Sequence, residues 1–208
     1  KQSDYMKYML PLLLVLTTSV QAQKIHYKSV LVDTHNDCIT ACIEKKVSLD
    51  QDLKGINHSD LKRFKEGGLD YQLFSIWCDG EKLNPYAWAM REMDTLDAVA
   101  ARNPDKIVVA KDWKTIKKTL RQGKIVAQYG VEGGHMIEDK IDRLDTFYNR
   151  GVRYMTLTWN NSPNWASSHT FEKTPITGTQ QKGLNNFGLQ IIERMNKLGI
   201  IVDVSHVG

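Results

Sequence analysis

The chain has 208 residues, of which 41% are hydrophobic and 25% are charged, and its formal net charge at pH 7 is +4. This length is enough for one domain with a sizeable hydrophobic core. The positive charge is small and spread along the chain, which argues against nucleic acid as a partner.

Residues 1–22 are predicted to be a cleavable signal peptide rather than part of the fold. Lys7 provides a basic start, residues 9–16 form an apolar run, and residues 20–22 (VQA) have the small side chains of a cleavage site. The apolar run is much shorter than the ~20 residues that span a bilayer. We therefore expect an exported protein, periplasmic or secreted, with no stable membrane span after signal cleavage.

Residues 23–208 alternate strand-like and helix-like segments, which predicts an α/β protein with a parallel sheet. Five apolar runs are predicted strands: residues 30–32, 69–77, 125–132, 153–158 and 200–206. Amphipathic segments between them are predicted helices: residues 59–65, 84–102, 111–120, 138–150 and 187–198. We find no internal repeat or interdomain linker, so residues 23–208 are predicted to belong to one domain.

Several predicted strands run into residues of metal-ligand type. His35 and Asp37 follow the first strand two residues apart, while Glu132 ends the third and His206 the fifth. In a parallel α/β barrel the carboxyl ends of the strands converge on one face, where active sites lie. Alone, the His-x-Asp pair also fits a turn-capping aspartate beside an ordinary polar histidine. The other strand ends favour a metal site.

We predict structural roles for the three cysteines and for the histidine that follows the third strand. Cys38, Cys42 and Cys78 are an odd number and cannot all pair within one chain, so we interpret them as small buried hydrophobic residues. His135 follows Glu132 in a Gly-Gly-His turn, where we expect it to stabilise the loop.

From Val30 to Val207 the chain resembles the amino-terminal part of the membrane dipeptidase (renal dipeptidase) family of zinc peptidases, in its bacterial form. Five segments in the family's order carry the resemblance, and together they are highly specific. They are VDTHND (32–37), DLKRFKEGG (60–68), GVEGGH (130–135), GVRYMTLT (151–158) and MNKLGIIVDVSH (195–206).

The resemblance implies a (β/α)8 TIM-barrel metallohydrolase, of which about the first five β/α units are present. On matching positions, His35 and Asp37 would bind one zinc ion, His206 would bind a second, and Glu132 would bridge both. Glu132 would thereby position a bridging hydroxide that attacks the peptide bond. The expected substrates are dipeptides, and we leave a homodimer open.

Two departures from the family pattern affect these expectations. Trp159 stands where characterised dipeptidases commonly carry histidine, so we expect a pocket residue that shifts substrate specificity. The remaining histidine of the second metal and the family's substrate-binding arginine have no counterpart before Gly208. We therefore expect these 208 residues alone to be neither stable nor active.

Three alternatives to a dipeptidase remain open from the sequence. The first two are an inactive half-barrel and a non-catalytic binding module. The third is another metal-dependent amidohydrolase, which acts on an amide other than a peptide. The Glu132 and His206 segments argue against this third alternative.

Overall fold

The computed structural model describes residues 22–173 and 182–208. The predicted signal peptide lies outside the described residues except for Ala22, so its export function stays a prediction. Residues 22–28 are helical. Within the described ranges, no helix combines the length and the apolar character that a membrane span requires.

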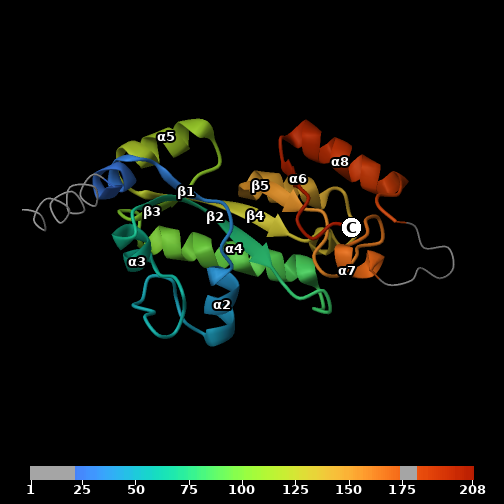
Figure 1. Ribbon diagram of the computed structural model, residues 1–208, viewed down its shortest axis with the longest axis horizontal. Helices are drawn as coiled ribbons and strands as arrows, with labels where there is room; N and C mark the ends of the chain where they lie inside the picture. The colour runs from blue at the N-terminus through green and yellow to red at the C-terminus, as the bar shows by residue number, and fades with distance from the viewer. Residues whose placement is uncertain (1–21, 174–181) are drawn as a thin grey trace, which may run out of the picture.

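Six strands of the described chain form one parallel sheet (Figure 1). They are β1 (Leu31–Asp33), β2 (Leu69–Trp77), β3 (Ile107–Val109), β4 (Ile125–Glu132), β5 (Val152–Thr156) and β6 (Ile201–Asp203). Their order is β1-β2-β4-β5-β6, and β3 pairs with the first residues of β4. Strand β2 pairs along one edge of β4. On the other edge, β3 pairs with the beginning of β4 and β5 pairs with its end.

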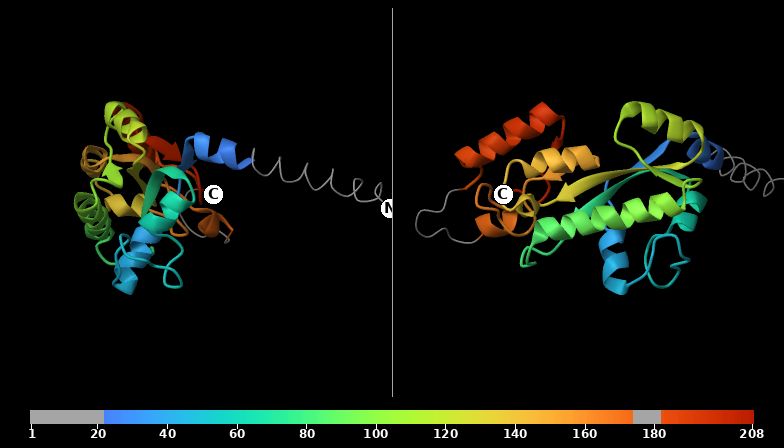
Figure 2. Two further views of the ribbon diagram at one scale, coloured as in Figure 1. Left: turned by 90° about the vertical axis from the view of Figure 1, so that its left-hand side faces the viewer. Right: turned by 180° about the vertical axis from the view of Figure 1, so that it is seen from behind.

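The parallel sheet curls into about half of a barrel, which confirms the predicted barrel architecture (Figure 2). The five predicted strands correspond to β1, β2, β4, β5 and β6. Strand β3 was not predicted. The prediction that the last strand reaches His206 is wrong, because β6 ends at Asp203. Asp203 Oδ1 then accepts hydrogen bonds from the backbone and hydroxyl of Ser205, which turns the chain away from the sheet.

Helices cover the outer face of the sheet (Figures 1 and 2). They are α2 (Cys38–Lys45), α3 (Leu61–Glu66), α4 (Pro85–Arg102), α5 (Trp113–Arg121), α6 (Arg143–Arg150) and α8 (Asn186–Leu198). Helix α7 (His169–Glu172) and a 3-10 turn, η1 (Gly134–Ile137), belong to the segments that follow β5 and β4. Helices α2 and α7 were not predicted. The predicted helix over residues 138–150 begins only at Arg143, because Glu138 and Asp139 adopt left-handed backbone angles that no helix continues through.

The core lies between the sheet and these helices. Phe74 and Ile76 of β2 and Val131 of β4 are fully buried, and they belong to the same apolar cluster as Met93 and Leu96 of α4. The cysteines, Cys38, Cys42 and Cys78, are free thiols buried in this core, which confirms that they act as small hydrophobic residues. The helices thus fix the strands from outside and leave the carboxyl ends of the strands available for a site.

Candidate metal centre

The turn between β1 and α2 presents His35 and Asp37 to the same space. Asp33 Oδ1 accepts a hydrogen bond from the His35 backbone N–H at 3.2 Å, and Asn36 Oδ1 accepts one from Cys38 N at 3.0 Å. Asp37 is the N-cap residue of α2, yet its side chain makes no capping hydrogen bond. The interpretation of Asp37 as a turn-capping residue is therefore wrong. Its carboxylate is directed at His35 instead.

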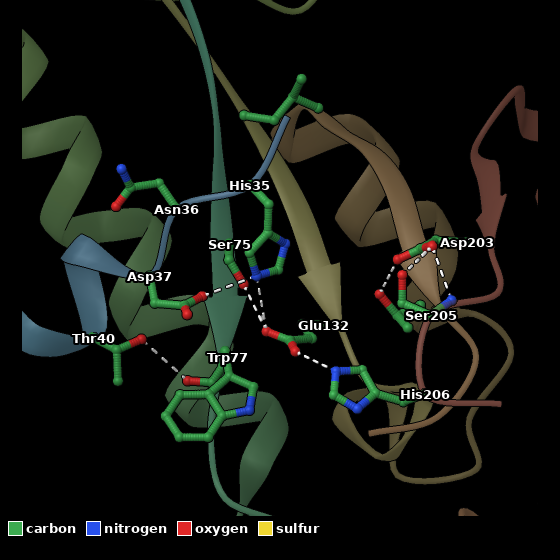
Figure 3. A network of polar contacts seen from close by, with 12 residues as sticks. His35, Asn36, Asp37, Thr40, Ser75, Trp77, Glu132, Asp203, Ser205 and His206 are labelled. Carbon is green, nitrogen blue, oxygen red and sulfur yellow. Dashed lines mark hydrogen bonds and ion pairs between the residues drawn. The ribbon is translucent and has the colours of Figure 1, made fainter. Parts of the chain in front are cut away.

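Glu132, the last residue of β4, joins this pair (Figure 3). His35 Nε2 lies 3.2 Å from Asp37 Oδ1 and 3.2 Å from Glu132 Oε2. One ligand atom from each of the three residues lies within 4.8 Å of the other two. One imidazole nitrogen and two carboxylate oxygens are a donor set that zinc accepts. The three residues therefore fit a metal ion.

The Glu132 carboxylate also reaches His206 and Ser75. Its Oε1 lies 3.0 Å from His206 Nε2, while Oε2 accepts a hydrogen bond from Ser75 Oγ at 3.1 Å (Figure 3). The Glu132 side chain is only 9% exposed, so the bond from Ser75 helps to offset its loss of hydration. Each carboxylate oxygen consequently faces a different histidine.

His206 comes to Glu132 from a tight turn rather than from a strand. Its backbone φ is +63°, in the left-handed region, and its Nδ1 lies 3.3 Å from Asn160 Oδ1. Asp203 holds the start of this turn, since it accepts hydrogen bonds from Ser205 and from Thr156 Oγ1, the latter at 2.6 Å. Asp203 and Ser205 thus shape the chain that carries His206.

The charges around His35 favour a cation. Hydrogen bonds to Asp37 and Glu132 raise the pKa of His35 to about 10, although burial opposes this shift. The same contact with His35 lowers the pKa of Asp37. Two carboxylates therefore hold a proton on this imidazole at neutral pH, in the space where a divalent metal ion would replace it.

A cavity of about 580 Å³ opens beside these residues on the inner side of the sheet. It is lined by His35, Glu132, Tyr154, Thr156, His206 and neighbouring residues of β2, β6 and the turn after β1. Trp159 lies beside this cavity rather than in its lining. The Trp159 ring centroid is 5.4 Å from that of Trp77 and 6.5 Å from that of His206.

The structure brings all four predicted metal ligands together, and it adds residues that the sequence did not reveal. Ser75 contacts Glu132, Tyr154 contacts His35, and Asn160 contacts His206. Ser75 is a hydroxyl residue inside an apolar strand, which is a signal that could have found it. His135 lies outside the ligand group: it is buried, and its Nε2 lies 3.2 Å from Cys78 O.

The family model described as Membrane dipeptidase (Peptidase family M19) matches residues 19–208. The chain belongs to the membrane dipeptidase family. This result confirms the resemblance found in the sequence. The roles of the individual site residues stay predictions.

Several solved structures share the fold of this chain. A metallopeptidase of family M19, dipeptidase AC, is 20% identical with a TM-score of 0.72, and the match covers 85% of this chain and 56% of that one. A Rhodobacter sphaeroides metallopeptidase liganded with a phosphinate mimic of the dipeptide L-Ala-D-Ala is 18% identical with a TM-score of 0.71, covering 86% and 59%. A Pseudomonas aeruginosa amidohydrolase is 20% identical with a TM-score of 0.68, covering 89% and 49%. The chain thus spans about half the length of these proteins, and at these identities the likeness shows the fold.

Proposed function

We propose that the whole protein hydrolyses dipeptides at a centre of two zinc ions. The observation that carries this proposal is the Glu132 carboxylate, which faces His35 with one oxygen and His206 with the other. A carboxylate that divides its oxygens in this way is suited to bridge two metal ions. Membership of a peptidase family supports peptide-bond hydrolysis as the reaction class.

Each predicted residue has a distinct task in this proposal. His35 and Asp37 would hold one zinc ion, His206 would hold the other, and Glu132 would contribute to both sites. When bound, zinc supplies Lewis-acid polarisation of the peptide carbonyl and a nucleophile that exists near neutral pH. Ser75 keeps the Glu132 carboxylate oriented through its hydrogen bond to Oε2.

The cavity supports a short peptide as the substrate. Its volume of about 580 Å³ suits a small ligand. Leu73, Ile201 and Val204 supply apolar lining for substrate side chains, while Glu132 lies in the same wall. The dipeptide mimic bound by the Rhodobacter sphaeroides relative supports dipeptides as the class to test.

The substitution Glu132→Gln tests the bridging role in the whole protein. A neutral amide is a weaker ligand than a carboxylate, so we expect both zinc ions to be lost together with dipeptidase turnover. Metal content per protein measures the first effect directly. Glu138→Gln is the matched control, because Glu138 follows the same strand but pairs with Arg143 away from the site. Two zinc ions held as tightly after Glu132→Gln as in the wild type would refute the assignment.

A second candidate function is hydrolysis of an amide that is not a peptide bond. It is favoured by the match to the Pseudomonas aeruginosa protein described as an amidohydrolase. A panel that compares dipeptides with N-acyl amino acids separates the two candidates. Turnover confined to the N-acyl compounds would favour the second. Zinc binding without turnover of either class would favour a non-catalytic binding module.

A further inference from the structure

The second ring nitrogen of His35 has its own partner inside the barrel. His35 Nδ1 lies 2.9 Å from the hydroxyl of Tyr154, a residue 119 positions later in the chain. Tyr154 belongs to β5 and is only 7% exposed. His35 thus contacts carboxylates through Nε2 and a phenol through Nδ1.

Tyr154 can reach His35 only because residue 130 is glycine. Gly130 of β4 and Tyr154 of β5 are register partners. A Cβ atom at position 130 would lie 1.9 Å from both Cε1 and Cζ of the Tyr154 ring. The backbone of Gly130 is not in the left-handed region, so this glycine is required for space and not for its conformation. The tyrosine ring lies over β4, in the space that a side chain at position 130 would fill.

A tyrosine phenol, whose ordinary pKa is about 10, is neutral near physiological pH. A neutral phenol oxygen can accept a hydrogen bond from Nδ1–H of His35. With Nδ1–H donated to Tyr154, Nε2 is the nitrogen that would face a metal ion in the space between Asp37 and Glu132.

We propose that Tyr154 is a positioning residue for the metal ligand His35, and that Gly130 provides the space in which it acts. This inference rests on the proposed zinc centre. Hydrogen bonds from the second nitrogen of a ligating histidine fix its tautomer and ring orientation, and their loss typically weakens metal affinity about 10–100-fold. Tyr154 therefore controls how well His35 presents Nε2 without touching the metal itself.

The test is Tyr154→Phe in the whole protein, with zinc affinity measured by competition with a chelator. We expect the zinc affinity to fall roughly tenfold to a hundredfold. The visible spectrum of the cobalt-substituted protein should also change. Gly130→Ala should weaken zinc similarly, because the added methyl group displaces the tyrosine ring. Adding Tyr154→Phe to Gly130→Ala should then cost little more, since both remove one contact.

Tyr129→Phe is the matched control. Tyr129 is a buried tyrosine on β4 whose hydroxyl bonds to Asp97 at 2.6 Å on the helical side of the sheet. Its loss should lower the thermal midpoint and leave zinc affinity and the cobalt spectrum unchanged. If the wild type binds zinc and Tyr154→Phe binds it with the same affinity and spectrum, the positioning role is wrong. If the wild type binds no zinc, the proposed zinc centre itself is overturned, and the positioning role falls with it.

Discussion

At the scale of single residues, Glu92 is the most unusual group outside the metal centre. It lies on α4, fully buried, and accepts hydrogen bonds from Thr40 Oγ1 of α2 and from the Trp77 backbone of β2, the latter at 2.9 Å. Burial raises the pKa of this carboxyl group to about 8. Glu92 thereby joins the helix that follows Asp37 to the end of the strand that carries Ser75.

This raised pKa predicts a pH-dependent stability. Between the ordinary carboxyl pKa and about 8, Glu92 keeps its proton in the folded protein and loses it on unfolding. The folded state then binds more protons, so its stability falls as pH rises through this range. We expect Glu92→Gln to remove that dependence. The thermal midpoint of the variant should therefore rise relative to that of the wild type as the pH increases from 5 to 8. Thermal melts at both pH values measure it.

The exposed Glu193→Gln is the control for that experiment. Glu193 pairs with Lys197 on the surface of α8, and we expect the difference between this variant and the wild type to stay constant over the same pH range. A constant difference for Glu92→Gln as well would show that the buried carboxyl group is ionised in the folded protein.

Trp159 is the residue at which a change of specificity is expected. Its indole lies against Trp77 and near His206, where a histidine would offer a smaller, hydrogen-bonding ring. We expect Trp159→His to change the ratio of kcat/KM between dipeptides of different size by roughly tenfold to two-hundredfold while zinc content stays the same. Trp113→His, on the exposed face of α5, should change nothing. Identical substrate profiles for wild type and Trp159→His would place this indole outside the pocket.

At the scale of secondary-structure elements, Asp60 explains why the segment at 60–68 folds as it does. Its carboxylate caps α3 at Arg63 N (2.8 Å), accepts from Leu53 N (3.2 Å), and pairs with Arg63 Nε (2.7 Å). One buried aspartate thus fixes a helix start, a loop and an arginine together. These contacts hold the pKa of Asp60 below its usual value.

We expect Asp60→Ala to destabilise the protein by about 3 kcal/mol, because it removes a helix cap and leaves buried donors without a partner. Urea unfolding measures the loss. Asp112→Ala removes the N-cap of α5, which is exposed to solvent and accepts from Thr115 N at 2.8 Å. Water can replace that bond, so its loss should be clearly smaller. Equal losses at the two caps would mean that burial of Asp60 adds nothing.

The elements also show which parts of the fold were predictable. Strand β4 is buried along its whole length and β2 along most of it, and the apolar residues that this burial requires make both strands recognisable in the sequence. Strand β3 has three residues, which are too few to show a periodic pattern. The 3-10 turn after β4 ends at Glu138 and Asp139, whose left-handed backbone angles no apolar pattern encodes.

The site was predictable to the same degree. His35, Asp37, Glu132 and His206 are polar residues after strands, and parallel strands bring their carboxyl ends together. Tyr154 and Asn160 were missed for a physical reason. Their contacts depend on the pairing of β4 with β5 and on the path of a loop, which are tertiary properties.

At the scale of the whole molecule, the path of paired strands in the described residues begins and ends with a strand that pairs on one side only. There, β1 pairs only with β2, and β6 pairs only with β5. Val32 and Ile201 on these edge strands are 44% and 65% exposed. Unpaired strand edges with apolar side chains promote association.

We therefore expect residues 23–208 expressed alone to self-associate, as measured by sedimentation velocity. Ile201→Lys should reduce this association, because a charge on an edge strand opposes pairing with another chain. Leu83→Lys is the control, since Leu83 is 87% exposed but lies in the loop before α4. A monomer that unfolds cooperatively and turns over dipeptides would contradict the expectation.

The spacing of the candidate ligands along the chain also sets the order in which a ribosome delivers them. His35, Asp37 and Glu132 are synthesised first, and His206 follows Glu132 by 74 residues. At ~5–20 residues per second, that interval lasts roughly 4–15 s. Strands β1, β2 and β4 pair with one another without β6, so the three-residue cluster can assemble on the growing chain. The contact between His35, Asp37 and Glu132 can therefore form before His206 has been synthesised, and the Glu132 oxygen that faces His206 gains its partner only afterwards.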